Sequence, residues 1–324
     1  MDHNMNDSSP IISKISEATM KWLLAQVAGG SAIEIRSLKG GISSAVYAVH
    51  IQNEGKTLQW VMRQYTDKGW LAVEPDLAVY ETEVLRAVWN VEIPSPKWLA
   101  ADFTGESCGL PTVLMSQLPG AVVLSPSNHR LWLAGLAEAL ADLHFKASVA
   151  KVVLKRNYKT YNRISELQAP EWSRCPDVWN RIIAILQNPN AVPEYELQLI
   201  HRDYHPTNVL WEQGRVSGIV DWVNSCMGPV GIDTGHCRLN LVQLYGVQSA
   251  DEFLHAYLNS GKGSREANNP YWDMLTLIEI LPGPPSVYEG WSDLGFLELD
   301  SALIIQRLDE YAESLLYKLS QVSF

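Results

Sequence analysis

The sequence predicts an α+β protein in two lobes, with strands gathered in the first lobe and helices in the second. Strand-like runs dominate residues 32–115, whereas helical periodicity dominates from residue 127 onward. A loop rich in polar side chains, residues 201–208, lies within the helical part. Segregated strands and helices favour an α+β arrangement over a doubly wound sheet, in which they would alternate along the chain. We place the lobes at residues 1–116 and 117–324.

The N-terminal lobe is expected to hold an antiparallel sheet with two helices. Apolar residues at helical spacing indicate the helices, and the first of them ends at Gly29-Gly30. The turn at residues 53–55 (Asn-Glu-Gly) is typical of a hairpin. The predicted helices cover residues 15–27 and 75–89, and the predicted strands cover 32–38, 45–52, 58–65, 98–101 and 112–115.

The C-terminal lobe is expected to be mainly helical. Residues 127–148 carry leucines that recur on one side, which is the pattern of an amphipathic helix. Between the helices, a short hairpin is predicted, with Trp211 and residues 219–220 on its strands and the turn at Gln213-Gly214. Further helices are predicted at residues 176–187, 233–244, 250–259, 270–281 and 297–319.

Composition narrows the class of protein. The chain has 324 residues, of which 47% are hydrophobic and 19% charged, as in a globular protein with a sizeable core. A net charge of −11 argues against binding to nucleic acid or to an anionic membrane surface. The four cysteines form no C-x-x-C pair, so they indicate neither a zinc site nor a disulfide framework. Polar residues 1–10 and the lack of a long apolar run predict an intracellular, cytoplasmic protein with no signal peptide.

The polar loop has the spacing of a phosphotransfer site. Asp203 follows His201-Arg202, and Asn208 comes after four intervening residues, while Asp221 ends a short apolar run. A hydroxyl nucleophile needs a carboxylate that orients it and accepts its proton, which is the role we expect for Asp203. Mg²⁺ prefers oxygen ligands, and Asn208 and Asp221 would supply them. An isolated aspartate is usually a turn or cap residue, but three polar residues at this spacing favour phosphotransfer.

Two upstream segments match what such a site needs. Glycines between the first two strands can bring backbone amides to phosphate oxygens, although a Gly-Gly pair before a strand is also typical of a plain hairpin turn. The candidate phosphate-binding residues of this segment are Gly40, Gly41, Ser43 and Ser44. On the third strand, Arg63 is the basic residue that could reach phosphates, or else an edge arginine facing water. Glu81 and Glu83 could hold it. They differ by about 200° around a helix and so point to different sides, and Glu81 lies next to the apolar face that packs on the sheet. We therefore choose Glu81.

Together these segments resemble the aminoglycoside phosphotransferase-type family, the small-molecule branch of the protein-kinase-like fold. The resemblance spans residues 40–235 and includes the segments 114–120, 137–144 and 228–233. It implies ATP-dependent transfer of the γ-phosphoryl group to a hydroxyl of a small molecule, with GTP as an alternative donor. It also implies that Asp203 is the catalytic base, that Asn208 and Asp221 hold Mg²⁺, and that Arg63 and Glu81 form an ion pair on the phosphates. The hinge residues that would contact adenine are Met115, Gln117 and Leu118.

The sequence departs from the family pattern at a few positions. Arg202 and Thr207 stand where the family commonly has glycine. Asp221 is followed by Trp222, not by Phe-Gly, and the Ala-Pro-Glu segment at 169–171 precedes the loop, so protein-kinase activity is disfavoured. An enzyme acting on a protein-borne acceptor and a binding protein of the same fold remain alternatives.

Several roles stay open at this stage. We expect His201 and His205 to brace the loop through hydrogen bonds to backbone, since Pro206 argues against a helical metal-ligand pair. Asp233 is expected to cap a helix, and His144 and His236 to be structural. The acceptor region would include acidic and aromatic side chains that bind an amine or simply pack, namely Trp272, Glu279, Tyr288, Glu289 and Trp291. Neither the acceptor nor the oligomeric state follows from the sequence.

Overall fold

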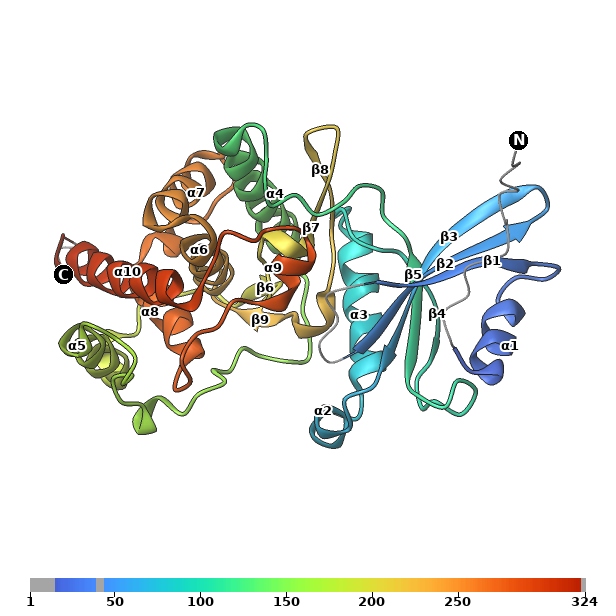
Figure 1. Ribbon diagram of the computed structural model, residues 1–324, viewed down its shortest axis with the longest axis horizontal. Helices are drawn as coiled ribbons and strands as arrows, with labels where there is room; N and C mark the ends of the chain where they lie inside the picture. Colours follow the sequence, from blue (N-terminus) through green and yellow to red (C-terminus); the bar gives the residue numbers. More distant parts are fainter. Residues whose placement is uncertain (1–14, 39–43, 322–324) are drawn as a thin grey trace, which may run out of the picture. The chain divides into compact units, whose positions relative to one another are not determined.

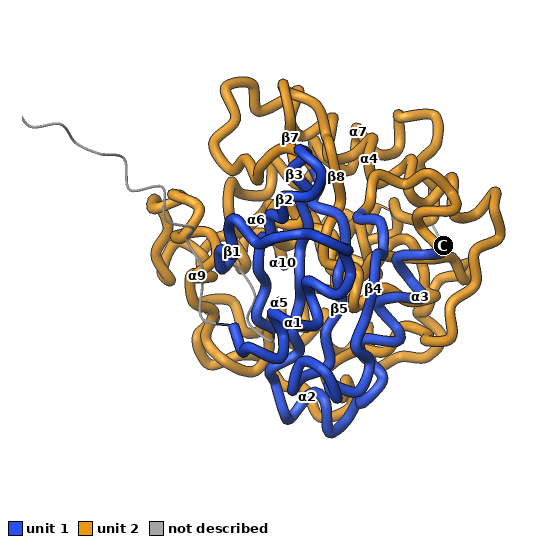
Figure 2. The backbone as a smooth tube through the Cα atoms, turned by 90° about the vertical axis from the view of Figure 1, so that its right-hand side faces the viewer, with its two compact units in different colours: residues 1–86, 96–118 blue, residues 87–95, 119–324 orange. Residues whose placement is uncertain are grey.

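The computed structural model describes residues 15–38 and 44–321. The chain divides into two compact units (Figure 2): unit 1 comprises residues 1–86 and 96–118, and unit 2 comprises residues 87–95 and 119–324. The predicted α+β class is confirmed, because the larger sheet lies in unit 1 and most helices lie in unit 2 (Figure 1).

Unit 1 is built on a five-stranded antiparallel sheet in the order β1-β2-β3-β5-β4. The hairpin turn between β2 and β3 is confirmed: Asn53 pairs with Lys56, and both Glu54 (φ +48°) and Gly55 (φ +78°) are left-handed. A turn with two left-handed residues has a backbone twist that matches the twist of the flanking strands. The strands are β1 (Ser31–Leu38), β2 (Ser44–Asn53), β3 (Lys56–Tyr65), β4 (Trp98–Asp102) and β5 (Thr112–Ser116).

The helices of unit 1 use both faces of this sheet (Figure 1). Successive side chains of a strand point to opposite faces. Met62 of β3 therefore packs with Leu23 of α1 (Glu17–Ala25), whereas the next residue, Arg63, meets Glu81 of α3 (Leu77–Asn90). The short helix α2 (Lys68–Val73) was not predicted, because it has no buried residue and hence no apolar periodicity.

Unit 2 is helical, with two small antiparallel strand pairs, β6 with β9 and β7 with β8. The predicted hairpin is confirmed, with Glu212 paired to Arg215 across the turn. The strands are β6 (Gln198–Ile200), β7 (Val209–Glu212), β8 (Arg215–Ile219) and β9 (Cys226–Gly228). The helices are α4 (His129–Val149), α5 (Pro176–Gln187), α6 (Gly231–Tyr245), α7 (Val247–Asn259), α8 (Pro270–Leu277), α9 (Glu289–Asp293) and α10 (Ser301–Gln321).

The centre of unit 2 is α6, which packs against α7, α8 and α10. Close packing at its first turn requires glycine: a Cβ on Gly231 would stand 2.2 Å from Cδ1 of Trp272. Trp272 and Trp291 are 2% and 1% exposed, so these two tryptophans of the expected acceptor region pack in the core. No helix among residues 15–38 and 44–321 is long and apolar enough to cross a membrane.

Asp309 of α10 fastens a long loop to the helical core. Its carboxylate accepts hydrogen bonds from Ser173 Oγ (2.6 Å), the Arg174 backbone N–H (2.9 Å) and Trp179 Nε1 (2.9 Å). Burial alone would raise the pKa of Asp309, but these donors outweigh it and hold the pKa below its usual value. A lowered folded-state pKa stabilises the protein above the unfolded-state pKa, and this contribution is lost as the pH falls through the folded-state value.

We therefore expect Asp309→Asn to lower the free energy of unfolding by about 1.5–3 kcal/mol at neutral pH. The difference from wild type should shrink below about pH 4, where Asp309 of the unfolded chain becomes protonated, and vanish as the pH falls through the lower folded-state pKa. Urea unfolding at several pH values measures both effects, with the exposed Glu313→Gln as control. A difference that grows as the pH falls would contradict this assignment.

Candidate active site

Asp233 holds the start of the polar loop. Its carboxylate accepts the backbone N–H of His201 (2.7 Å) and of Arg202 (2.6 Å), and contacts His144 Nε2 at 3.0 Å. The expectation that Asp233 caps a helix was wrong: Val230 is the N-cap of α6, and Asp233 lies within the first turn. The fully buried carboxylate instead accepts hydrogen bonds from a part of the chain that is distant in sequence. His201 was correctly expected to bond backbone, since its Nε2 lies 2.9 Å from the Val220 carbonyl oxygen.

Arg202, which stands where the family commonly has glycine, adopts a backbone conformation that favours glycine. Arg202 has φ +66°, in the left-handed region that costs a side chain about 1–2 kcal/mol. Its guanidinium offsets this cost by donating to the Lys159 carbonyl (2.6 Å), pairing with Glu279 (3.6 Å) and lying 3.8 Å from the centroid of the Tyr161 ring. The loop therefore presents an arginine clamped to aromatic and acidic partners immediately before Asp203.

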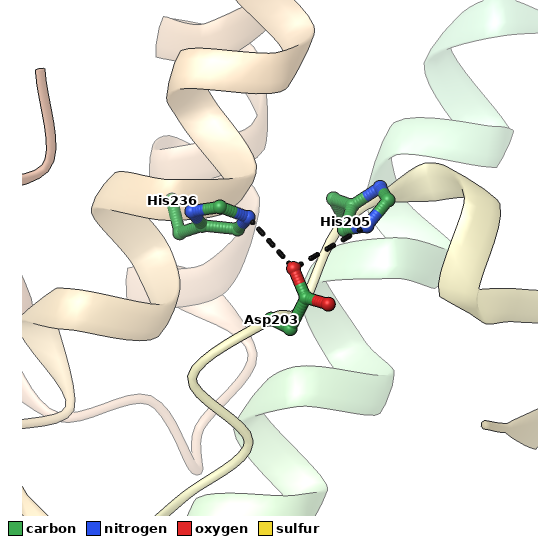
Figure 3. A group of neighbouring side chains, drawn as sticks. All are labelled: Asp203, His205 and His236. Atoms are coloured by element: carbon green, nitrogen blue, oxygen red, sulfur yellow. Dashed lines mark ion pairs between the residues drawn. The ribbon is translucent and has the colours of Figure 1, made fainter. Parts of the chain in front are cut away.

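Asp203 lies between two imidazoles (Figure 3). Its Oδ1 is 3.2 Å from His236 Nε2 and 3.5 Å from His205 Nε2. Burial would raise the pKa of Asp203, but the two neighbouring histidines outweigh it and hold the pKa of the carboxyl below its usual range. Asp203 is therefore ionised at neutral pH, and its side chain is 29% exposed, so a ligand can reach it. An accessible carboxylate that is ionised at neutral pH is suited to accept a hydrogen bond from a hydroxyl group.

His205 bonds side chains, so the expectation of a bond to backbone was wrong for this residue. Its Nδ1 lies 2.8 Å from Thr207 Oγ1, and its Nε2 lies 3.1 Å from Asn208 Nδ2. Burial lowers the pKa of His205 to about 4, so the ring is neutral at neutral pH. Because Asn208 Nδ2 also donates to the Asp203 main-chain carbonyl (2.8 Å), the amide nitrogen is fully used and the amide oxygen points away from these partners.

Asn208 and Asp221 come together at one end of the β7–β8 hairpin. Val209 pairs with Ile219, and the Val220 N–H donates to the Asn208 carbonyl at 2.9 Å, so the two residues flank the same hydrogen-bonded pair. The strand β8 ends at Ile219, and Asp221, two residues later, is left-handed (φ +66°). Two oxygen donors, one amide and one carboxylate, fit the ligand preference of Mg²⁺.

In unit 1, Arg63 and Glu81 form a buried ion pair. Arg63 Nη1 lies 3.1 Å from Glu81 Oε1, and the other carboxylate oxygen accepts the Tyr65 hydroxyl at 2.6 Å. Arg63 is 8% exposed and Glu81 1%, so Arg63 is not an edge arginine facing water. Ser44 begins β2 and is buried. Gly40, Gly41 and Ser43 lie outside the described residues.

The predicted hinge residues lie at the end of β5. Met115 is in the strand, opposite Val61 of β3. Gln117 donates its backbone N–H to the Gln59 carbonyl at 3.1 Å and places its side-chain oxygen 3.1 Å from His50 Nε2. Leu118 is the last residue of unit 1. The role of these residues in binding a nucleotide stays a prediction.

Unit 2 also contains a cavity of about 760 Å³, a size typical of small-molecule sites. Its lining includes Tyr161, Glu166, Glu171, Trp172 and Pro282. Tyr161 connects the cavity to the polar loop, because the same ring faces the Arg202 guanidinium. The indole N–H of Trp172 is buried and has no hydrogen-bond partner among the described residues.

Sequence reasoning missed part of this constellation. Tyr158 and Tyr161 were not singled out, although Tyr158 donates to Glu279 (3.3 Å) and both rings face Arg202. His236 was expected to be structural, but it contacts Asp203. This contact depends on the packing of α6 beside the polar loop, and no local pattern in the sequence indicates it.

Three comparisons with known proteins bear on this arrangement. The model of the phosphotransferase enzyme family matches residues 34–268. A homoserine kinase from Rhizobium etli (strain CIAT 652) is 23% identical over 236 residues, which is 70% of this chain and 70% of that protein. Among solved structures, a thermostable mutant of aminoglycoside phosphotransferase APH(4)-Ia, in a ternary complex with ADP and hygromycin B, is 15% identical, with a TM-score of 0.58, and covers 91% of this chain and 97% of that one.

The choline kinase LicA from Streptococcus pneumoniae also matches, at 15% identity and a TM-score of 0.58, over 92% of this chain and 97% of that one. At these identities the two solved structures show the fold. The protein-kinase-like fold predicted from the sequence is thereby confirmed.

Proposed function

We propose that this chain, which belongs to the phosphotransferase enzyme family, transfers the γ-phosphoryl group of ATP to a hydroxyl of a small molecule. The observation that carries the proposal is the loop and hairpin of unit 2. There an ionised, accessible Asp203 lies five residues before Asn208, which directly precedes β7, and Asp221 lies two residues after the end of β8, the strand paired with β7. Phosphoryl transfer demands little more of a protein than positioning and charge stabilisation, and these residue types supply both.

Each residue has a distinct role in this proposal. Asp203 accepts a hydrogen bond from the acceptor hydroxyl and takes its proton as the new oxygen–phosphorus bond forms and ADP leaves. Asn208 and Asp221 hold the metal, and Mg²⁺, when bound, supplies charge neutralisation for the phosphates. Arg63 offers its guanidinium to phosphate oxygens and is kept in position by Glu81. Gly40, Gly41, Ser43 and Ser44 would cradle the phosphates, and residues 115–118 would contact the base.

The cavity of unit 2 supports a small acceptor. It is large enough for a compound of drug-like size, at about 760 Å³, and it adjoins the loop through Tyr161. Glu166 and Glu171 put two carboxylates on its lining; Glu166 pairs with Arg163 of the same lining at 3.1 Å, so we assign Glu171 to an amine of the acceptor.

The proposal is tested by measuring ADP or GDP formation from ATP or GTP with Mg²⁺ across a panel of hydroxyl compounds. The panel includes aminoglycosides, macrolides, amino alcohols such as choline, homoserine and sugars. We expect one compound class to stimulate nucleotide consumption well above the acceptor-free rate, and Mg²⁺ removal to abolish it. Failure to bind Mg²⁺-nucleotide at all, measured by calorimetry, would contradict the proposal.

A further inference from the structure

Three potential metal ligands converge beside the proposed catalytic carboxylate (Figure 3). They belong to Asp203, His205 and His236, each of which offers one ligand atom, and these three atoms lie within 4.8 Å of one another. Asp203 and His205 come from the polar loop, and His236 comes from α6, the helix that Asp233 ties to that loop. All three residues belong to unit 2.

The separations fit a small, borderline-soft metal ion. Zinc bonds to nitrogen and carboxylate oxygen measure about 2.0–2.2 Å, which places neighbouring ligand atoms of a tetrahedral site about 3.3–3.5 Å apart. The two observed nitrogen–oxygen separations are 3.2 and 3.5 Å. The imidazole nitrogens of the two histidines lie within 4.8 Å of each other, so reaching the same spacing shortens their separation by at most about 1.5 Å. Two imidazoles with one carboxylate suit Zn²⁺ or Co²⁺ rather than Mg²⁺, which prefers oxygen.

The His205 imidazole is also oriented as metal ligands usually are. Thr207 Oγ1, 2.8 Å from His205 Nδ1, can accept the proton of that nitrogen, and the Asn208 amide facing Nε2 indicates that Nε2 carries a lone pair. A partner on the distal nitrogen is the usual device that fixes a ligand tautomer. His236 Nδ1 is buried and has no hydrogen-bond partner among the described residues. His236 thus lacks such a partner, and binding a metal through Nε2 would place its proton on this unpartnered nitrogen.

We propose that Asp203, His205 and His236 form an inhibitory binding site for Zn²⁺ or a similar divalent transition metal. The inhibitory effect rests on the proposed function, whereas metal binding at this site does not depend on it. A metal bound here takes the Asp203 lone pair that would otherwise accept a hydrogen bond from the hydroxyl of the small molecule. It therefore blocks binding of that molecule and not binding of the nucleotide. Binding also displaces the Asn208 amide from His205 Nε2, while its bond to the Asp203 main-chain carbonyl can remain.

The binding site is tested on the nucleotide-free, full-length chain, prepared without a polyhistidine tag. Co²⁺ is titrated in, and the visible absorption bands of low-coordinate Co²⁺ are recorded, followed by competition with Zn²⁺. We expect one Co²⁺ per chain, displaced by Zn²⁺ and unaffected by a large excess of Mg²⁺. His236→Gln and Asp203→Asn should each weaken binding at least tenfold, and Thr207→Ala should weaken it less, through the loosened His205 ring.

The matched control is His255→Gln, which removes an exposed histidine of α7 and should leave Co²⁺ binding unchanged. Circular dichroism checks that each variant is folded. Unchanged affinity and spectrum in both folded His236→Gln and folded Asp203→Asn would overturn the site, as would failure of the wild type to bind either metal at millimolar concentration. These results do not depend on turnover, so a failure of the site is distinguishable from a failure of the proposed function.

Once an acceptor is known, steady-state kinetics tests the inhibitory role. Zn²⁺ should raise the apparent KM for the acceptor without raising that for the nucleotide. Inhibition that is competitive with the nucleotide, or that persists undiminished in His236→Gln, would overturn the inhibitory role.

Discussion

Asp203→Asn is expected to lower kcat by about 10²–10⁴-fold, the contribution usual for a general base. The change removes the negative charge and the basic lone pair but keeps the shape of the side chain. It leaves the loop connected, because Asn208 bonds the main-chain carbonyl of residue 203 and not its carboxylate. Asn208 and Asp221 are untouched, so the dissociation constant for Mg²⁺-nucleotide should change little.

Initial rates at saturating nucleotide and acceptor measure the loss, and calorimetry measures nucleotide binding in the same preparations. The control is Glu212→Gln, which neutralises an exposed carboxylate at the far end of the β7–β8 hairpin and should keep the wild-type kcat. A kcat for Asp203→Asn within tenfold of wild type would show that this carboxylate is not the base.

Asp273→Ala is expected to lower the free energy of unfolding by about 3–5 kcal/mol, because it removes the buried ion-pair partner of a buried arginine. Arg238 of α6 is 1% exposed; it pairs with Asp273 of α8 and, at 2.7 Å, with Asp251 of α7. The second oxygen of Asp273 accepts the Tyr311 hydroxyl of α10 at 2.9 Å. The network therefore joins four helices, and without Asp273 the half-exposed Asp251 is the one ionic partner that the guanidinium keeps among the described residues.

Urea unfolding of the isolated variant measures this loss. Two further variants separate the cost of an unpaired buried charge from the cost of lost side-chain packing. Asp251→Ala removes the exposed partner and should cost about 1 kcal/mol or less. The double change Arg238→Met with Asp273→Leu removes both charges and should recover most of the stability lost in Asp273→Ala. A double variant no more stable than Asp273→Ala would locate the effect in packing.

Features encoded by neighbouring residues were predictable from the sequence. The turn at Glu54-Gly55 and the β7–β8 hairpin follow from local turn chemistry, and both occur where expected. Helix α5 begins and ends as predicted, at Pro176 and Gln187, because a proline at the first position and a strong apolar stripe mark it. The choice of Glu81 over Glu83 followed from helical geometry alone, and Glu81 is the residue that meets Arg63.

Features that depend on distant contacts were not predictable. Asp233 has the sequence context of a cap, yet its carboxylate binds amides 31 and 32 residues earlier, which no local pattern encodes. The β6–β9 pair has three residues in each strand, too few for a periodic signal. The contact of His236 with Asp203 exists only once α6 has packed beside the polar loop. Periodicity places α6 on the chain but does not specify which neighbour each of its side chains meets.

The most direct test of the central claim is to follow the phosphoryl group itself. ATP labelled with ¹⁸O in its γ-phosphoryl group is incubated with Mg²⁺, the protein and the acceptor that stimulates ADP formation, and the products are analysed by mass spectrometry. The account predicts that the acceptor gains one labelled phosphoryl group on a hydroxyl oxygen, and that Asp203→Asn nearly abolishes this product. Label that appears only in inorganic phosphate, with the acceptor unmodified, would contradict it.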